Sequence, residues 1–387
     1  MSSVIQPRLL RRLNLRRVLE LLKTFGPSTR ADLTRLSGIS APTVSKAVAN
    51  LIQSGLLEEG DPSTTSLGRP GTVLRLARDK AQVLGVVLDA RRCTVVSAGL
   101  DGTLNDDFAV FFDTPDNYAE LIDLVATAAM RLKRRPGVRT LALGMSIPGL
   151  INRRLQQAVL SPNLHITDGH SPDRELSRRL GIECVMYQET QALCLGHQLY
   201  GAGDDAADDF AMLEISTGLG LGVVSAGRLM EGHSGLAGEL GHITVVPGGR
   251  LCGCGNRGCL ETVATDSALA RNVSERIGRT VDIEEAARLI REGVIGDEEL
   301  HSVCEYLSIA IAAAINIFNP ATLFIHGRLF DAQEGLFEHV SRLARSRALS
   351  PSAEDCNLFR ARWSKDQAAV AAAILQVMNS LGPVVDE

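Results

Sequence analysis

Aromatic residues and long apolar runs are scarce in this chain. Phe, Trp and Tyr account for 4% of its 387 residues, and there is a single Trp. No apolar run reaches the roughly 18 residues that a membrane-spanning helix needs, so we expect no membrane partner. The N-terminus lacks the apolar core and the cleavage site of a secretory signal, and we therefore expect a cytoplasmic protein.

Basic charge is scarce beyond the first 80 residues. Residues 1–80 contain 13 Lys and Arg against 6 Asp and Glu, whereas the remainder contains 27 against 39. The length favours more than one domain, since a single core rarely serves more than about 300 residues. A basic N-terminal module on an acidic body indicates that this module meets a polyanion.

The basic module has the pattern of a winged helix-turn-helix over residues 8–77. Apolar spacing predicts a helix over 8–24, a second over 28–38 and a third that begins at the cap Ser40. A short strand, a polar loop and an alternating strand over 72–76 then predict a two-stranded wing. This combination is typical of a DNA-binding domain.

The third helix and the wing supply the candidate DNA contacts. Small or polar side chains on a helix suit groove edges and phosphates, and an arginine at the tip of a wing suits a minor groove. The candidate DNA-binding residues are Ser40, Thr43, Ser45, Lys46, Asn50 and Arg69. Because such units usually bind paired half-sites, we expect a homodimer or higher homo-oligomer on a double-stranded DNA operator. A helical protein-docking module with a solvated loop is the alternative.

Three of the eight cysteines fall within eight positions, and a histidine precedes them by ten residues. The candidate metal ligands are His242, Cys252, Cys254 and Cys259. One imidazole and three thiolates form the closed ligand set that is typical of structural Zn²⁺. A catalytic zinc needs an open position for water. A zinc finger needs an exposed helix after its ligands, whereas here a strand is expected over Ile243–Val246 within the acidic body. The sequence therefore predicts a structural zinc.

Two glycine-containing motifs are poor candidates for catalysis. Residues 144–149 resemble a serine-nucleophile elbow, but the spacing differs and Pro148 stands where a helix must start. Residues 218–222 resemble a dinucleotide fingerprint, but the β-prone residues that follow cannot open the helix that this motif requires. The alternation of strands and helices from residue 83 onward predicts an α/β body of two lobes.

The run "GELGHITVVPGGRLCGCGNRGCLET", which ends at residue 262, resembles the zinc and sugar signature of the ROK family of repressors, open reading frames and sugar kinases. The resemblance covers about residues 83–385. It implies a multidomain α+β chain in which an actin-like, two-lobed sugar-kinase body follows the winged helix. Lobe 1 would span 83–195, and lobe 2, with the zinc motif and the C-terminal helices, would span 196–385. Chains of this kind resemble transcriptional repressors such as the N-acetylglucosamine and xylose repressors.

The same resemblance implies a set of sugar contacts. The matching positions are Gly149, Asn163, Gln188, Glu189, Glu239, His242 and Glu261. Carboxylates and an imidazole can bond several vicinal hydroxyls and leave the wrong epimer with unpaired groups. His242 would contact zinc with one nitrogen and order the sugar pocket with the other. Surface charge is the alternative for Glu239 and Glu261.

Three motifs on the ATP side depart from the pattern of the family's kinases. Residues 89–92, "DARR", lack the glycine pair that wraps a phosphate, and residues 326–328, "HGR", replace the glycine pair beside adenosine. Glu189 stands at the position of the catalytic base, which is an Asp in the kinases. Its extra methylene moves the carboxylate by about 1 Å, which costs orders of magnitude in rate. We therefore expect no catalytic residue and no enzyme activity, with Glu189 as a degenerate base or as a helix-start acid favoured by the dipole.

Together these features predict a DNA-binding transcriptional regulator of carbohydrate metabolism, a repressor, that senses a sugar or sugar phosphate. Effector binding would favour one lobe arrangement and so shift the spacing of paired winged helices. The alternative function is an active ATP-dependent kinase for a hexose or N-acetylhexosamine with an appended regulatory domain. A protein-docking scaffold without an effector is a third possibility.

Overall fold

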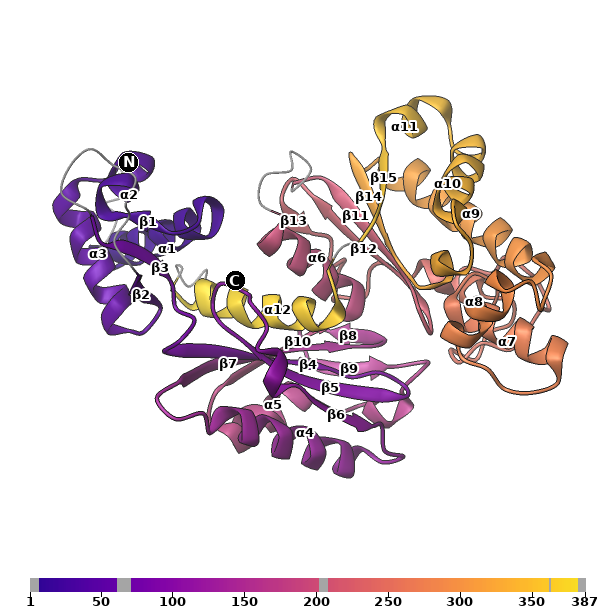
Figure 1. The fold of residues 1–387 in the computed structure, drawn as a ribbon, viewed down its shortest axis with the longest axis horizontal. Helices are drawn as coiled ribbons and strands as arrows, with labels where there is room; N and C mark the ends of the chain where they lie inside the picture. Colours follow the sequence, from indigo (N-terminus) through magenta and orange to yellow (C-terminus); the bar gives the residue numbers. More distant parts are fainter. Residues whose placement is uncertain (1–6, 61–70, 202–207, 362, 382–387) are drawn as a thin grey trace.

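The computed structural model describes residues 7–60, 71–201, 208–361 and 363–381. These residues form a winged helix at one end of the molecule and a body of two α/β lobes (Figure 1). The first lobe lies beside the winged helix, and the second lobe lies at the far end (Figure 1).

The described residues of the N-terminal module form three helices and a small sheet. Its elements are α1 (Pro7–Phe25), β1 (Ser28–Thr29), α2 (Arg30–Ser37), α3 (Ala41–Gln53), β2 (Leu57–Gly60) and β3 (Val73–Leu76). Thr29 caps α2, because its hydroxyl accepts the backbone N–H of Asp32 while the Asp32 carboxylate accepts the N–H of Thr29. Gly38 ends the helix at a left-handed φ of 68°. Strands β2 and β3 pair antiparallel and form the predicted wing.

A five-stranded sheet forms the first lobe, in the order β10-β7-β4-β5-β6. Its strands are β4 (Ala81–Val87), β5 (Arg92–Ala98), β6 (Val110–Asp113), β7 (Arg139–Ile147) and β10 (Glu183–Gln188). The β4–β5 and β5–β6 pairs are antiparallel, whereas β4–β7 and β7–β10 are parallel. Helices α4 (Tyr118–Lys133) and α5 (Pro172–Leu180) cover one face, and β8 (Leu150–Asn152) and β9 (Gln157–Leu160) form a hairpin.

The second lobe repeats this strand connectivity, in the order β13-β12-β11-β14-β15. Its strands are β11 (Phe210–Ile215), β12 (Leu219–Ser225), β13 (Arg228–Leu229), β14 (Thr322–His326) and β15 (Asn357–Arg360). Its helices are α7 (Asp266–Ile277), α8 (Ile283–Arg291), α9 (Glu298–Phe318), α10 (Leu336–Arg347) and α11 (Ser350–Asp355). The first three strands pair antiparallel and the last two pair parallel, as in the first sheet. The body therefore consists of two lobes with one shared topology.

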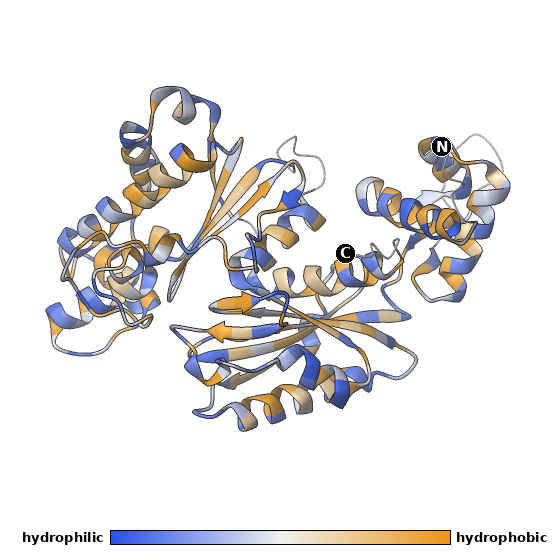
Figure 2. Ribbon diagram, turned by 180° about the vertical axis from the view of Figure 1, so that it is seen from behind, coloured by the Kyte–Doolittle hydropathy of each residue, from blue (hydrophilic) through white to orange (hydrophobic). Residues whose placement is uncertain are grey.

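Helix α9 is long and apolar enough, by length and composition alone, to cross a membrane. More than half of that stretch is buried, and Leu307, Ile311 and Ile315 are fully buried in the core of the second lobe. We therefore interpret α9 as a core helix. In Figure 2, which colours residues by hydropathy, apolar residues are likewise concentrated in the central strands of both sheets.

The last helix, α12 (Lys365–Ser380), packs against β4 and β7 of the first sheet and along α6 (Glu189–Tyr200). The sequence-based domain limits place this helix with the second lobe, so its position differs from that expectation. Small residues explain the close approach, since a Cβ on Gly144 would lie 2.2 Å from the carbonyl oxygen of Ala369. The alanines of α12 face this glycine, and the helix fits directly onto the strands.

Candidate functional site

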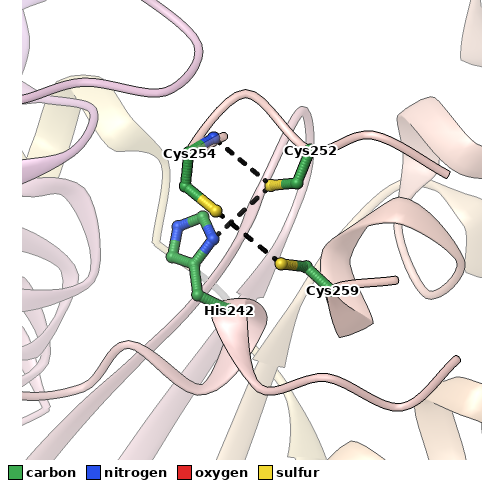
Figure 3. Close-up of side chains that lie close together, drawn as sticks. All are labelled: His242, Cys252, Cys254 and Cys259. Carbon is green, nitrogen blue, oxygen red and sulfur yellow. Dashed lines mark hydrogen bonds between the residues drawn. The ribbon is translucent and has the colours of Figure 1, made fainter. Parts of the chain in front are cut away.

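The predicted metal ligands converge in the second lobe. His242 ends a short 3-10 helix over Leu240–His242, the first two cysteines lie in the loop that follows, and Cys259 precedes a second 3-10 helix over Leu260–Thr262. The four donor atoms all lie within 4.8 Å of one another (Figure 3). The sequence spacing alone therefore identified a set of side chains that meet in space.

The distances within this cluster fit a tetrahedral metal site. Cys254 Sγ lies 3.7 Å from Cys259 Sγ, and Cys252 Sγ lies 3.6 Å from His242 Nδ1. A tetrahedron with metal–sulfur bonds of about 2.3 Å has edges of about 3.8 Å. A disulfide requires about 2.05 Å between sulfurs, so these distances exclude one. The three cysteines are free thiols and the fourth donor is an imidazole. The residues present therefore fit Zn²⁺.

Glycines shape the loop around the cluster. Gly258 has a φ of +73°, and a Cβ there would lie 1.7 Å from the carbonyl oxygen of Val246. A Cβ on Gly253 would lie 2.3 Å from the carbonyl oxygen of Pro162, so the loop contacts the segment that precedes Asn163. The predicted strand over Ile243–Val246 is wrong, because only an isolated bridge between Thr244 and Cys259 forms there. The chain folds back on itself at this loop and offers no extended neighbour for a strand.

His242 lies between the metal cluster and two carboxylates. Its Nδ1 lies 3.8 Å from Glu261 Oε1, and its Nε2 lies 3.7 Å from Glu239 Oε2. Cys252 Sγ contacts Glu261 Oε1 at 2.9 Å. Burial, and secondarily the charge of Glu261, raises the pKa of Glu239 to about 7. The Nδ1 atom of His242 thus lies beside the thiol of Cys252, and its Nε2 atom faces the carboxylate of Glu239.

Asn163 and Glu261 meet over the glycine turn after β11. A Cβ on Gly218 would lie 2.8 Å from Asn163 Nδ2 and 3.0 Å from Glu261 Oε2. Gly149 adopts a φ of +91° and packs on Leu160 and Ser161, two positions before Asn163. Four predicted sugar contacts, Asn163, Glu239, His242 and Glu261, therefore form one connected polar cluster, and Gly149 supports the loop that carries the first of them.

Gln188 and Glu189 lie at the start of α6, and they have different surroundings. Gln188 is buried, its Oε1 accepts the hydroxyl of Thr190 at 2.5 Å, and its Nε2 faces Gly220. Glu189 Oε1 instead accepts a charged hydrogen bond from Lys365 Nζ at 2.7 Å. Burial raises the pKa of Glu189 to about 7, against the opposing effect of Lys365.

Lys365 was not among the residues that the sequence singled out, but the structure places it at the centre of a buried cluster of carboxylates. Its ammonium lies 3.0 Å from Glu214 Oε1, 3.6 Å from Asp89 Oδ2 and 3.2 Å from Ser216 Oγ, in addition to Glu189. It is 176 positions away from Glu189, so no local motif links the two. The sequence does contain a signal for the start of α12, because Ser364 and Gln367 form a capping box. That signal does not predict which carboxylates contact Lys365.

A cleft of about 610 Å³ adjoins Lys365 and is lined by both lobes. Asp89 and Arg91 line it from the first lobe, and His326 and Arg328 line it from the second. Asp266 closes part of it, since its carboxylate accepts the backbone N–H groups of Arg328 and Leu329 at 2.9 and 2.8 Å. Residues of both runs that depart from the kinase pattern, 89–92 and 326–328, therefore line one cleft.

The candidate DNA contacts are only partly exposed. Ser40, Ser45 and Lys46 are exposed on or beside α3, and Thr43 is half-buried with its hydroxyl 2.9 Å from that of Ser40. Asn50 is also half-buried, and its Oδ1 accepts a hydrogen bond from Arg11 of α1 at 3.2 Å. Asn50 therefore joins two helices of the module instead of projecting away from it. Arg69 lies outside the described residues.

Residues 84–378 match the model of the ROK family, and residues 16–64 match the model of the MarR family. The chain belongs to the ROK family. The predicted fold class, a winged helix followed by a two-lobed ROK body, is thereby confirmed.

Curated ROK relatives resemble this chain over nearly its whole length. The "DNA-binding transcriptional dual regulator NagC" of Escherichia coli strain K12 is 25% identical over 382 residues, which cover 95% of this chain and 93% of NagC. The xylose repressor of Bacillus subtilis strain 168 is 24% identical over 366 residues, which cover 94% of each chain. These regulators therefore align with the winged helix and the ROK body together.

Solved ROK structures include both a regulator and kinases. A ROK family transcriptional regulator, a homologue of the E. coli MLC protein, has a TM-score of 0.79 at 25% identity and covers 96% of this chain and 97% of its own. A ROK family glucokinase from Streptomyces griseus, solved with glucose and AMPPNP, has a TM-score of 0.67 at 22% identity. It covers 76% of this chain and 98% of its own length, and at this identity it shows the fold of the body alone.

Proposed function

We propose that this chain is a sugar-responsive transcriptional repressor that acts in the cytoplasm as a homodimer on operator DNA. The observation that carries the proposal is the span of the match, because NagC and the xylose repressor align with both the winged helix and the body. The basic charge of residues 1–80 supports contact with phosphates, and the exposed Ser45 and Lys46 supply contacts on α3.

DNA binding is tested by selecting duplexes from a random-sequence pool with the purified full chain and measuring affinity against salt. We expect a repeated half-site and a linear fall of log affinity with log salt. Lys46→Ala should reduce the slope by about 1. Arg134→Ala removes the same charge at the end of α4, outside the winged helix, and should leave the slope unchanged. Selection of no sequence, or affinity independent of salt, would overturn the proposal.

We propose Zn²⁺ as the metal of the cluster, in a structural role. His242 Nδ1 and the thiolates of Cys252, Cys254 and Cys259 would hold it, and four protein ligands leave no position for a reacting water. When bound, the ion fixes the loop and the orientation of His242. Elemental analysis of the purified chain should give close to one zinc per protein, and a value close to zero would contradict the assignment.

We propose that the sugar effector binds at the polar cluster formed by Asn163, Glu239, His242 and Glu261, next to Gly149. The supporting observation is that carboxylate, imidazole and amide groups meet around the Gly218 turn, which suits several vicinal hydroxyls. A thermal-shift panel of hexoses, pentoses, N-acetylhexosamines and their phosphates tests it. At least one compound should raise the melting temperature of the wild type but not that of Asn163→Ala.

We propose that sugar phosphorylation is absent. A catalytic base must be free to accept the proton of a sugar hydroxyl, whereas the Glu189 carboxylate is engaged by Lys365 at 2.7 Å. The arginines of the 89–92 run stand where the kinases place a phosphate-wrapping glycine pair. These features favour the regulator over an ATP-dependent hexose or N-acetylhexosamine kinase, which is the rival function.

A further inference from the structure

The ion pairs of Lys365 join the two lobes at a single atom. Asp89 follows β4 of the first sheet, Glu214 lies in β11 of the second sheet, and Glu189 begins α6 between them. All three carboxylates contact the same ammonium, at 3.6, 3.0 and 2.7 Å respectively. A change in the separation of the lobes should therefore alter the length of at least one of these pairs.

Breaking these ion pairs should cost more free energy than breaking surface pairs, because the groups are largely shielded from water. The side chain of Lys365 is 15% exposed and that of Glu214 is 2% exposed. Removing one partner of a buried pair leaves an uncompensated charge, which is more costly than losing a surface ion pair. Lys365 is also the first residue of α12, where the helix dipole disfavours a cation, so the carboxylates must offset that effect.

Two helices lead away from this junction side by side. Glu189 is the first residue of α6 and Lys365 is the first residue of α12, so the contact between them joins the two helix starts. The helices pack along each other, and α12 runs from the lobe junction toward the winged helix (Figure 1). With a rise of 1.5 Å per residue, the 16 residues of α12 span about 24 Å.

The far ends of both helices are held by α1 of the winged helix. Arg12 donates hydrogen bonds to the carbonyl oxygens of Ser380 and Leu381 at the end of α12, at 2.7 and 3.2 Å. Lys23 donates to the carbonyl oxygen of Gln198 in the last turn of α6 at 2.7 Å. These basic side chains bond carbonyls at helix C-termini, where a cation is favoured.

An apolar core continues across the same contact. Leu19 and Leu22 of α1 belong to one buried cluster with Leu199 of α6 and with Ile374 and Met378 of α12. The winged helix is thus packed on the ends of the two helices as well as bonded to them. A rigid connection of this kind can transmit a displacement that a flexible tether cannot.

We propose that α6 and α12 are the coupling element of this regulator, in which Lys365 senses the separation of the lobes and Arg12 and Lys23 convey it to the winged helix. The inference rests on the proposed function, since it assigns a role to the two helices between effector cluster and DNA-binding module. The effector site contacts this junction through the Ser216–Gly218 turn, which meets Lys365 at Ser216 and Glu261 at Gly218.

Hydrogen–deuterium exchange of the full chain, without DNA or sugar, tests the coupling. Lys365→Met should raise the exchange rates of the amides in α1 by about fivefold or more, although the substitution is at the other end of α12. Lys133→Met is the matched control, because Lys133 bonds the carbonyl of Leu180 within the first lobe and has no part in these helices. It should alter exchange near α4 and α5 only.

Two further variants keep the test decisive. Glu214→Gln removes the ion pair to the second lobe and leaves Lys365 paired with its other carboxylates. This variant should also speed exchange in α1, and it replaces Lys365→Met in the test if that variant does not fold. In a background of Arg12→Gln with Lys23→Gln, Lys365→Met should add little to the exchange of α1, because the connection is already cut. Exchange that rises only around Ser216 and the first turn of α12 would overturn the coupling. The same conclusion would follow if Lys365→Met raised the exchange of α1 equally in the wild type and in the double-variant background. Loss of DNA selection would instead contradict the proposed function and leave this result standing.

Discussion

His242 Nε2 lies 3.7 Å from Glu239 Oε2, while Nδ1 of the same ring lies 3.6 Å from Cys252 Sγ. The ring therefore joins the metal cluster to the polar cluster that we assign to the sugar. A metal on Nδ1 fixes the ring and leaves Nε2 as the group that faces Glu239. Metal content and effector binding should accordingly depend on each other.

Removal of one thiol should abolish both metal and effector responses. Cys254→Ser is expected to bring the zinc content close to zero, to lower the melting temperature and to remove the sugar-induced shift. Elemental analysis and thermal-shift measurements check this on the same samples. Cys184→Ala, a buried cysteine outside the cluster, should retain one zinc and the sugar response. A zinc-free Cys254→Ser chain with an unchanged sugar response would separate the two clusters.

Kinase activity should be absent and should not return when the base is shortened. Glu189→Asp recreates the residue of the kinases, but Lys365 still contacts Asp89 and Glu214 at this junction. We expect no ADP release above background for the wild type or for this variant across hexoses and N-acetylhexosamines. A coupled ADP assay measures it. Sustained turnover by the wild type that is lost in Glu189→Gln would establish the kinase alternative.

A side chain at Gly144 should displace α12. A Cβ there would lie 2.2 Å from the carbonyl oxygen of Ala369 and 2.6 Å from the backbone nitrogen of Ala373, neither of which can move alone. Gly144→Ala is therefore expected to destabilise the protein by about 2–3 kcal/mol. Gly296→Ala is the control, because a Cβ at Gly296 meets no atom of the described residues within 4 Å. Urea unfolding monitored by circular dichroism compares the two, and equal midpoints would refute the packing argument.

Asp266 should give the protein a pH-dependent stability. Burial raises the pKa of this carboxyl to about 7, against the opposing effect of the N–H groups of Arg328 and Leu329, and its unfolded value is about 3.9. The folded state therefore binds the proton more tightly. The stabilisation linked to it is complete below about pH 4 and is lost as the pH rises through about 7.

Asp266→Asn removes this titration. As the pH rises from 5 to 7.5, the unfolding free energy of the wild type should fall relative to that of the variant. Urea titrations at several pH values measure both. Asp355→Asn changes an exposed carboxyl on α11 and should leave the wild-type profile unaltered. Parallel profiles for wild type and Asp266→Asn would show that the carboxyl does not titrate in this range.

Asn50 and Ser45 should have opposite effects on stability and on DNA binding. Asn50→Ala removes the hydrogen bond to Arg11 and is expected to cost about 1 kcal/mol of stability with little change in the affinity for DNA. Ser45→Asp places a negative charge on the exposed face of α3 and should weaken DNA binding while stability stays the same. Urea unfolding and fluorescence anisotropy on a selected duplex distinguish them. A clear loss of affinity for the duplex in the folded Asn50→Ala chain would return this residue to the DNA interface.

The winged helix and the metal cluster follow from local sequence. Caps such as Thr29 and Gly38, and apolar residues at helical spacing, act within a few residues, so they fix the helices of the N-terminal module without distant help. The ligands of the metal cluster lie within 18 positions of one another and include three cysteines whose chemistry is specific. The predicted strand over Ile243–Val246 failed because a strand needs a partner, and the loop supplies only one bridge.

The lobe junction was decided by tertiary structure alone. Lys365 follows an ordinary helix start, and nothing near it in the sequence indicates that its ammonium meets three carboxylates from Asp89, Glu189 and Glu214. The position of α12 likewise depends on Gly144, more than 200 positions earlier, because only a residue without a Cβ admits the helix backbone at that strand. Local interactions and reactive side chains can be recognised from the order of residues, whereas the partners of a buried charge are set by which segments the fold brings together.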